Sequence, residues 1–187
     1  MKQELQNIID LMMHKNASFV ISGENNSPLT ADIRKDTTVN GQHPYAVVIT
    51  CSDSRMPAEH IFSAGIGELF VIRTAGNVVS DFEIGSVEYG TEHLGAKIVM
   101  VLGHSYCGAV SAAIEGHAEG HIKSIINEIT QAIGTEKNPR KCEILNTLYT
   151  AHKLIEKSKI LANLVKEEKI AIITAMYDIE TGVVKLI

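Results

Sequence analysis

The chain has 187 residues, about the size of one domain, with 45% hydrophobic and 21% charged residues, as in ordinary globular proteins. Its formal net charge of −5 argues against an electrostatic grip on nucleic acid, so we expect no nucleic-acid partner. No apolar run approaches the ~18 residues of a membrane span, and the first residues lack a basic stretch leading into an apolar segment. We therefore expect a soluble, cytoplasmic protein without a membrane partner.

The N-terminal part of the chain predicts one helix followed by a loop. Within residues 2–20 the apolar positions recur every three or four residues: Leu5, Ile8, Ile9, Met12 and Met13. This amphipathic helix suits packing on its own chain and packing on a neighbouring subunit equally well. Residues 23–44 are rich in turn formers, so we expect mostly loop there.

The middle and C-terminal parts predict strands that alternate with helices. Short β-branched runs lie at residues 45–50, 69–73, 97–102 and 169–174. Such continuous apolar strands between helical patterns indicate a mainly parallel central β-sheet flanked by helices. The tail, residues 177–187, turns at Glu180-Thr181-Gly182 and predicts an antiparallel edge strand. The fold class is α/β, with one domain over residues 1–187 and the chemistry-bearing core at about residues 40–115.

Three helices are predicted between these strands. One covers residues 81–94, because Ser80 and Glu83 have capping-box spacing and Gly95 can end it. A second covers residues 122–133, and Pro139 marks the next boundary. A long third helix spans about residues 141–166. Its predicted buried side consists of Ile144, Leu145, Leu148, Ile155, Leu161 and Leu164.

Two motifs directly follow predicted strands and carry candidate metal ligands. One contains Cys51, and the other is His104-Ser105-Tyr106-Cys107. In open α/β sheets ligands collect at the carboxyl ends of strands. Two thiolates and one imidazole suit Zn²⁺, and three protein ligands leave a fourth position open, as in catalytic zinc sites. The 53-residue gap between Cys51 and His104 excludes a compact zinc finger.

Asp53 and Arg55 are the candidate catalytic residues beside these ligands. Asp53 could accept a hydrogen bond from a zinc-bound hydroxide, or move onto the metal as a fourth ligand in an inactive state. A bidentate Arg55 could hold the carboxylate away from the metal. Two thiolates reduce the formal charge of the centre to 2 − 2 = 0, so bound water is acidified less and activity should rise into alkaline pH.

The chain resembles the β-class carbonic anhydrases. The resemblance rests on four segments: residues 51–55, 68–77, 86–89 and 103–108. It implies a zinc-dependent enzyme that reversibly hydrates carbon dioxide to bicarbonate and a proton by zinc-bound hydroxide. It also implies Cys51, His104 and Cys107 as metal ligands and Asp53 with Arg55 as a catalytic dyad.

The same resemblance implies a substrate pocket shared between two subunits. The residues that would bind substrate are Gln42, Phe70, Ala75, Tyr89 and Gly108. By this likeness Gln42, Phe70 and Tyr89 reach in from a partner subunit. A homodimer or a higher even homo-oligomer is therefore implied, with carbon dioxide and bicarbonate as the small-molecule partners.

The motifs alone leave several alternatives open. Carbonyl sulfide and carbon disulfide resemble carbon dioxide in shape and need the same zinc-bound hydroxide, so a hydrolase of either would use this ligand set. The protein could also be a catalytically silent zinc or bicarbonate sensor, or hold a structural zinc with Asp53 as permanent fourth ligand. The presence of Asp53, Arg55 and Gln42 together favours turnover.

Overall fold

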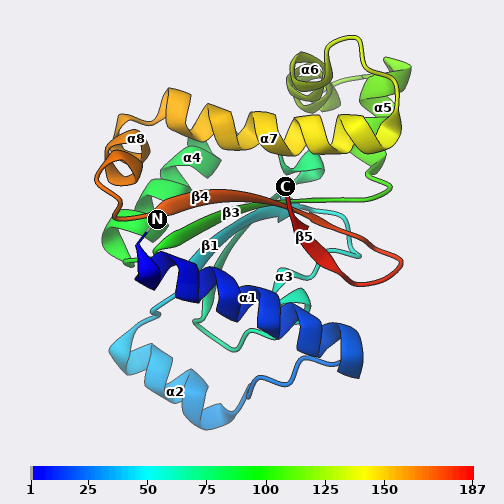
Figure 1. Ribbon diagram of the computed structural model, residues 1–187. Coiled ribbons are helices and arrows are strands. Elements are labelled where there is room, and N and C mark those ends of the chain that lie inside the picture. Colours follow the sequence, from blue (N-terminus) through cyan, green and yellow to red (C-terminus); the bar gives the residue numbers. More distant parts are fainter. Residues whose placement is uncertain (1) are drawn as a thin grey trace.

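A five-stranded sheet forms the centre of the protein, for which a computed structural model describes residues 2–187. Its strands are β1 (Ala46–Cys51), β2 (Leu69–Thr74), β3 (Ile98–His104), β4 (Ala171–Tyr177) and β5 (Val184–Leu186), in the order β2-β1-β3-β4-β5. The first four pair in parallel and β5 is antiparallel to β4 (Figure 1). The predicted α/β fold, including its antiparallel edge strand, is confirmed.

Helices cover both faces of this sheet (Figure 1). On one face lie α1 (Gln3–Ser22) and the short α3 (Ala58–Ile61), and on the other lie α4 (Asp81–Glu88), α7 (Pro139–Lys157) and α8 (Lys159–Lys166). The remaining helices are α2 (Ala31–Asn40), α5 (Gly108–Glu115) and α6 (Ile122–Ile133). Among residues 2–187 no helix combines the length and the apolar character needed to cross a membrane.

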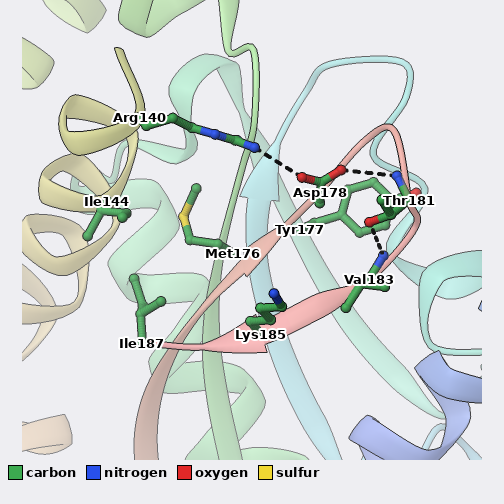
Figure 2. A pocket seen from close by; sticks show the side chains of 9 residues that line it. All are labelled: Arg140, Ile144, Met176, Tyr177, Asp178, Thr181, Val183, Lys185 and Ile187. Carbon is green, nitrogen blue, oxygen red and sulfur yellow. Dashed lines mark hydrogen bonds and ion pairs between the residues drawn. The ribbon is translucent and has the colours of Figure 1, made fainter. Parts of the chain in front are cut away.

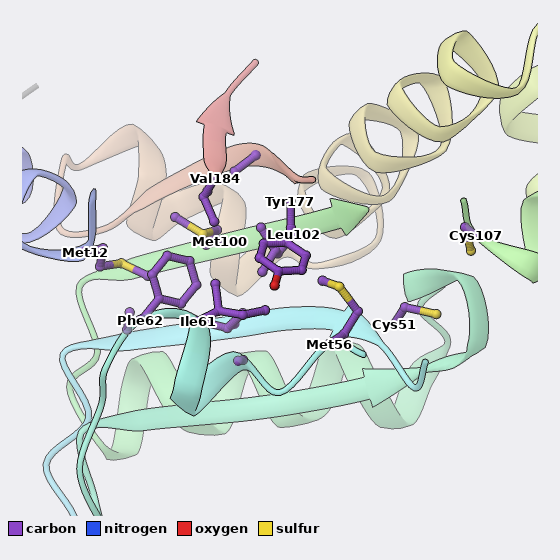
Figure 3. Close-up of a cluster of buried hydrophobic side chains, with 14 of the residues drawn as sticks. Met12, Cys51, Met56, Ile61, Phe62, Met100, Leu102, Cys107, Tyr177 and Val184 are labelled. Carbon is purple, nitrogen blue, oxygen red and sulfur yellow. The ribbon is translucent and has the colours of Figure 1, made fainter. Parts of the chain in front are cut away.

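The central strands contribute side chains to two apolar cores, because successive side chains point to opposite faces of the sheet. One core, drawn in part in Figure 3, joins α1 and α3 to the sheet through Met12, Phe62, Met100 and Leu102. The other lies beneath α4, α7 and α8 and contains Val47, Ile49, Val99, Val101, Leu154 and Leu161. Cys51 and Cys107 lie at one end of the first core, away from Met12 (Figure 3).

The prediction of a loop over residues 23–44 is wrong in part, because residues 31–40 form α2. Thr30 caps this helix by accepting a hydrogen bond from the backbone N–H of Ile33 at 3.4 Å. None of the residues of α2 is buried. The helix therefore has no apolar stripe, which is the signal on which sequence periodicity depends.

The long third helix is also predicted incorrectly in two respects. It is interrupted at Ser158, whose extended backbone ends α7 and whose hydroxyl caps α8 by accepting from Leu161 N–H at 3.0 Å. In addition, its expected apolar side faces outward on α7: Leu145, Leu148 and Ile155 are 37%, 42% and 41% exposed. The buried face of α7 is instead largely polar, comprising Cys142, Glu143, Asn146, Thr147, Thr150 and Leu154.

The other predicted helices are confirmed, with one local difference. Glu83 accepts a hydrogen bond from Ser80 N–H at 2.8 Å, completing the capping box of α4. After Glu88 the helix continues as a π-helical turn over Tyr89–His93 before Gly95 ends it in a left-handed conformation. A hydrogen-bond pattern of this kind is not visible in hydrophobic periodicity.

Gly103 lets α7 approach β3 closely, and this contact yields a prediction. A Cβ at this position would lie 2.0 Å from Thr147 Oγ1. We expect Gly103→Ala to lower the free energy of unfolding by about 1–3 kcal/mol because the overpacked helix must move. Gly85→Ala is the control, since a Cβ there meets nothing within 4 Å and should be neutral or stabilising. Equal unfolding midpoints in urea for Gly103→Ala and wild type would contradict this reading.

Candidate metal centre

The three predicted ligands meet at the carboxyl ends of two adjacent strands. Cys51 ends β1 and His104 ends β3, which pairs with β1 in parallel. Cys107 directly precedes α5. One ligand atom from each of the three residues lies within 4.8 Å of the others, and all three residues are buried. Two cysteine sulfurs and an imidazole thus converge at one place.

A tight turn returns the chain from His104 to Cys107. Tyr106 adopts a left-handed backbone, with φ of 59°, which is uncommon for a residue other than glycine. Ser105 anchors the turn: its N–H donates to Tyr177 O at 3.0 Å, and its hydroxyl accepts from Ile179 N–H at 2.9 Å. The end of β4 therefore fixes the turn that carries two of the three ligands.

The surroundings of His104 leave one ring nitrogen available to a metal. Nδ1 lies 2.8 Å from the carbonyl oxygen of Ser105, and because a carbonyl can only accept, Nδ1 carries the proton that it donates there. Nε2 is buried and has no hydrogen-bond partner within the described part of the chain. A buried nitrogen without a partner is costly, and binding a metal would satisfy it.

The two cysteine side chains are hydrogen-bonded to each other, and Cys51 is the one favoured as a thiolate. The hydrogen bond with Cys107 lowers the pKa of Cys51, and the nearby His104 ring and the N–H groups of Asp53 and Gly76 lower it further. The same hydrogen bond, together with burial, raises the pKa of Cys107. The two N–H groups donate to Cys51 Sγ at 3.4 Å and 3.2 Å. Sulfurs at about 2.3 Å from a tetrahedral ion lie about 3.8 Å apart, so small side-chain movements bring this set onto one Zn²⁺. The donor set fits zinc.

Asp53 and Arg55 form a bidentate pair beside the ligands. Asp53 Oδ1 accepts from the backbone N–H and from Nε of Arg55, at 3.0 Å and 2.9 Å, and Oδ2 accepts from Nη2 at 2.7 Å. These bonds hold the pKa of the Asp53 carboxyl well below its usual range. Arg55 also donates to Tyr106 O at 3.2 Å. The carboxylate is therefore ionised and fixed in orientation.

The five predicted substrate residues fall into two groups. Ala75 and Gly108 lie at the centre, since Gly76 contacts Cys51 Sγ and Gly108 follows Cys107. Phe70, Tyr89 and Gln42 lie toward the other end of the sheet. Phe70 pairs in register with Val47, near the start of β1, and its ring centroid is 6.1 Å from that of Tyr89. Gln42 precedes β1. One chain does not bring these three to its own metal centre.

Several supporting residues were not predicted from the sequence. Arg73 donates to Cys51 O at 3.2 Å and to Asp53 O at 2.7 Å, so it holds the backbone of the first motif. A charged residue near the end of an apolar strand was the available signal for it. Glu143 and Asn146 also contact the centre from α7, and no local pattern distinguishes them.

A separate hollow lies between α7 and the last two strands. It measures about 440 Å³ and is drawn in Figure 2. Its lining residues are Arg140, Ile144, Met176, Tyr177, Asp178, Thr181, Val183, Lys185 and Ile187. The three candidate ligands do not line it, so its volume says nothing about the metal centre.

This sheet, with Cys, His and Cys at its carboxyl edge and a carboxylate–guanidinium pair beside them, defines an α/β protein with a site able to hold a metal. The profile of the carbonic anhydrase family matches residues 46–184, more than half of the chain. The chain belongs to the carbonic anhydrase family.

Curated relatives match over part of their length. The carbonic anhydrase of Mycolicibacterium smegmatis is 39% identical over 123 residues, covering 63% of this chain and 59% of that protein. Carbonic anhydrase 2 of Mycobacterium tuberculosis is 39% identical over 98 residues, covering 50% of this chain and 47% of that protein. The chain thus spans about half to three fifths of the length of these relatives.

Solved structures agree with the fold. A Coccomyxa β-carbonic anhydrase in complex with acetazolamide gives a TM-score of 0.74 at 25% identity, covering 84% of this chain and 78% of that one. The β-carbonic anhydrase CafA of Aspergillus fumigatus gives 0.70 at 24% identity, covering 83% and 85%. The resemblance found in the sequence motifs is confirmed.

Proposed function

We propose that this protein catalyses the reversible hydration of carbon dioxide to bicarbonate and a proton, with Zn²⁺ as its metal. The observation that carries the proposal is the convergence of Cys51, His104 and Cys107 within 4.8 Å beside a bidentate Asp53–Arg55 pair. Membership of the carbonic anhydrase family supports the same reaction.

Each residue of the centre has a proposed task. Cys51, His104 and Cys107 would hold the metal, which when bound lowers the pKa of a water molecule so that a nucleophile exists near neutral pH. Asp53 would accept a hydrogen bond from the remaining proton of the attacking oxygen and so aim its lone pair at carbon. Arg55 would keep Asp53 in that orientation.

A second subunit would complete the pocket, so we propose a homodimer or a higher even homo-oligomer. Gln42, Phe70 and Tyr89 lie far from the centre of their own chain but are available to a neighbour. Tyr89 is 49% exposed, and Phe82, at the other end of α4, is 86% exposed. A partner subunit that covers these rings would remove apolar surface from water. The Gln42 amide would then donate a hydrogen bond to an oxygen of the substrate bound in the partner subunit's site.

The alternative functions gain no support from the geometry. A structural zinc or a silent sensor would need Asp53 on the metal, whereas both of its carboxylate oxygens accept hydrogen bonds from Arg55. Carbonyl sulfide or carbon disulfide hydrolysis would use the same residues, and assays with those substrates distinguish it. A reducing compartment such as the cytoplasm suits the site, because its thiolate ligands must stay reduced.

The pH dependence of turnover tests the proposal. We expect kcat for carbon dioxide hydration to rise between about pH 7 and about pH 9. Two thiolate ligands would neutralise the charge of the metal, so the metal would lower the pKa of its bound water less than it does with neutral ligands, and the hydroxide would form at higher pH. The pKa of Asp53 is depressed, so it is charged throughout this range and contributes no titration to the rise. Stopped-flow assays with pH indicators measure the profile, and a flat profile would contradict the proposed centre.

A further inference from the structure

The buried polar face of α7 lies directly against the metal centre. Glu143, Asn146, Thr147 and Thr150 are 4%, 1%, 0% and 2% exposed. Buried polar groups cost free energy unless they are hydrogen-bonded, so each of these side chains needs a partner. Glu143, Asn146 and Thr150 bond to turns that carry or contact the two cysteine ligands. Thr147 instead donates to Glu143 O within α7 and lies 3.5 Å from Met176 Sδ.

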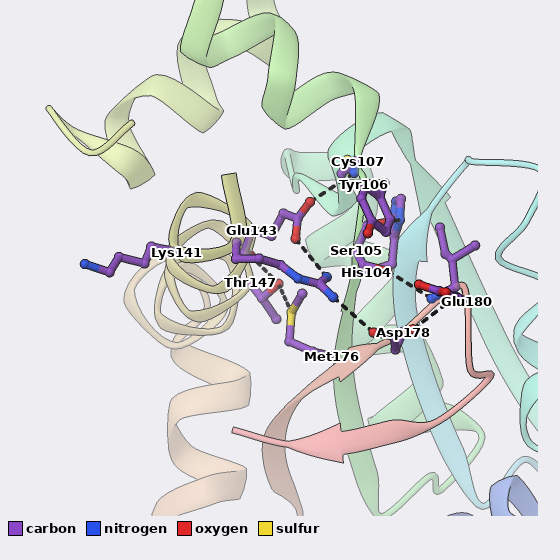
Figure 4. A network of polar contacts seen from close by, with 12 residues as sticks. His104, Ser105, Tyr106, Cys107, Lys141, Glu143, Thr147, Met176, Asp178 and Glu180 are labelled. Atoms are coloured by element: carbon purple, nitrogen blue, oxygen red, sulfur yellow. Dashed lines mark hydrogen bonds and ion pairs between the residues drawn. The ribbon is translucent and has the colours of Figure 1, made fainter. Parts of the chain in front are cut away.

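Glu143 holds the turn of Cys107. Its Oε1 accepts from the backbone N–H of Cys107 at 3.2 Å, and its Oε2 lies 3.3 Å from Nη1 of Arg140 (Figure 4). Arg140 in turn donates to Asp178 at 3.0 Å and its guanidinium lies 5.4 Å from the ring centroid of Tyr106. Both carboxylate oxygens of Glu143 are therefore partnered, which offsets the cost of burying its charge.

Asn146 holds the turn that contacts Cys51. Its Nδ2 donates to Gly76 O at 2.7 Å, and the N–H of Gly76 donates to Cys51 Sγ at 3.2 Å. Gly76 has a φ of 70°, and a Cβ there would lie 2.7 Å from Ile129 Cδ1. Thr150 donates to the next carbonyl, Asn77 O, at 3.2 Å. This turn is thus fixed by α7 on one side and packed against α6 on the other.

We propose that Glu143 and Asn146 are positioning residues of the metal centre, which act through the backbone of Cys107 and Gly76 to preset the two sulfur ligands. The proposal rests on the proposed function only in requiring that the centre bind a divalent metal. It also gives a physical reason for the reversed polarity of α7. The inward face of α7 makes hydrogen bonds to the ligand turns, and its apolar residues point outward.

Metal affinity separates this role from ordinary stabilisation of the helix. The variants are Glu143→Leu, Glu143→Gln and Asn146→Leu, with Glu156→Leu and Glu156→Gln as matched controls on the exposed side of α7, where Glu156 is 54% exposed. Co²⁺ is the probe, because thiolate-to-metal charge-transfer bands report both coordination and, by chelator competition, affinity. Circular dichroism and urea unfolding of the metal-free proteins check the fold.

We expect Glu143→Leu and Asn146→Leu to bind Co²⁺ about 10- to 100-fold more weakly, with altered charge-transfer bands, as for other outer partners of metal ligands. Glu143→Gln should lose less affinity than Glu143→Leu, because its amide oxygen can still accept from Cys107 N–H, although its amide nitrogen then faces the Arg140 donor. The two Glu156 variants should match wild type. If leucine at position 143 prevents folding, Asn146→Leu decides, because it removes no charge and keeps the branched outline of the side chain.

Wild-type affinity and an unchanged spectrum in folded Glu143→Leu and Asn146→Leu would overturn the inference. An equal loss in Glu143→Gln and Glu143→Leu would also overturn it for Glu143, because the effect would then come from the charge and not from the hydrogen bond. Failure of the wild type itself to bind Co²⁺ would overturn the proposed metal centre as well. Strong Co²⁺ binding without carbon dioxide hydration would reject the proposed reaction and leave the inference standing.

Discussion

Replacing Arg55 by alanine is expected to lower kcat/KM for carbon dioxide hydration by about 100-fold while the metal content stays at its wild-type value. Arg55 makes three of its hydrogen bonds to Asp53, two to Oδ1 and one to Oδ2. The backbone N–H bond survives the substitution, but the two guanidinium bonds are lost. A carboxylate free to rotate no longer aims the nucleophile, and misplacement by about 1 Å costs about that factor.

Two further variants sharpen this test. Arg55→Lys keeps the charge but cannot make the bidentate pair, so it should recover only part of the activity. Arg34→Ala, on the exposed helix α2, is the control and should keep full activity. Near-normal turnover of Arg55→Ala with full metal content would remove the proposed role of the dyad.

The second large effect is expected for Gln42, and it tests the shared site. Gln42→Ala should lower kcat by about 10²- to 10³-fold, as does removal of a side-chain amide that stabilises developing charge on oxygen. Gln42 is exposed and precedes β1, at the end of the sheet opposite Cys51. Such a loss without a change in metal content is the expected result. Gln131→Ala, also at an exposed glutamine, should be silent.

Mixing two inactive variants then distinguishes a shared site from a site within one chain. Asp53→Ala and Gln42→Ala subunits that exchange at random form mixed dimers in which one of the two sites is intact. About a quarter of wild-type activity should return, as two-fold symmetry requires. No recovery, with mixed dimers verified by mass spectrometry, would mean that Gln42 does not act in the partner's site.

Much of the fold could be predicted because its signals are local. Each parallel strand is a short, continuous apolar run, and the cap of α4 is carried by Ser80 and Glu83 alone. The candidate metal ligands could be predicted equally well, because the carboxyl ends of neighbouring parallel strands meet at one edge of the sheet. Cys51 and His104 end β1 and β3 as expected.

The parts that could not be predicted depend on contacts between distant segments. Hydrophobic periodicity places Leu145 and Leu148 inside, yet α7 buries Glu143 and Asn146 because turns 36 and 70 residues away need hydrogen-bond partners. The local sequence of α7 contains no signal that predicts its contacts with those turns. The exposed helix α2 likewise has no apolar stripe to reveal it.

The central claim is that the Cys51, His104 and Cys107 centre hydrates carbon dioxide. It is tested most directly by stopped-flow hydration with a pH indicator, on protein whose zinc content has been measured. We expect about one zinc per chain and rapid hydration that is lost in Asp53→Ala. Full zinc content without hydration between about pH 7 and about pH 9 would contradict it.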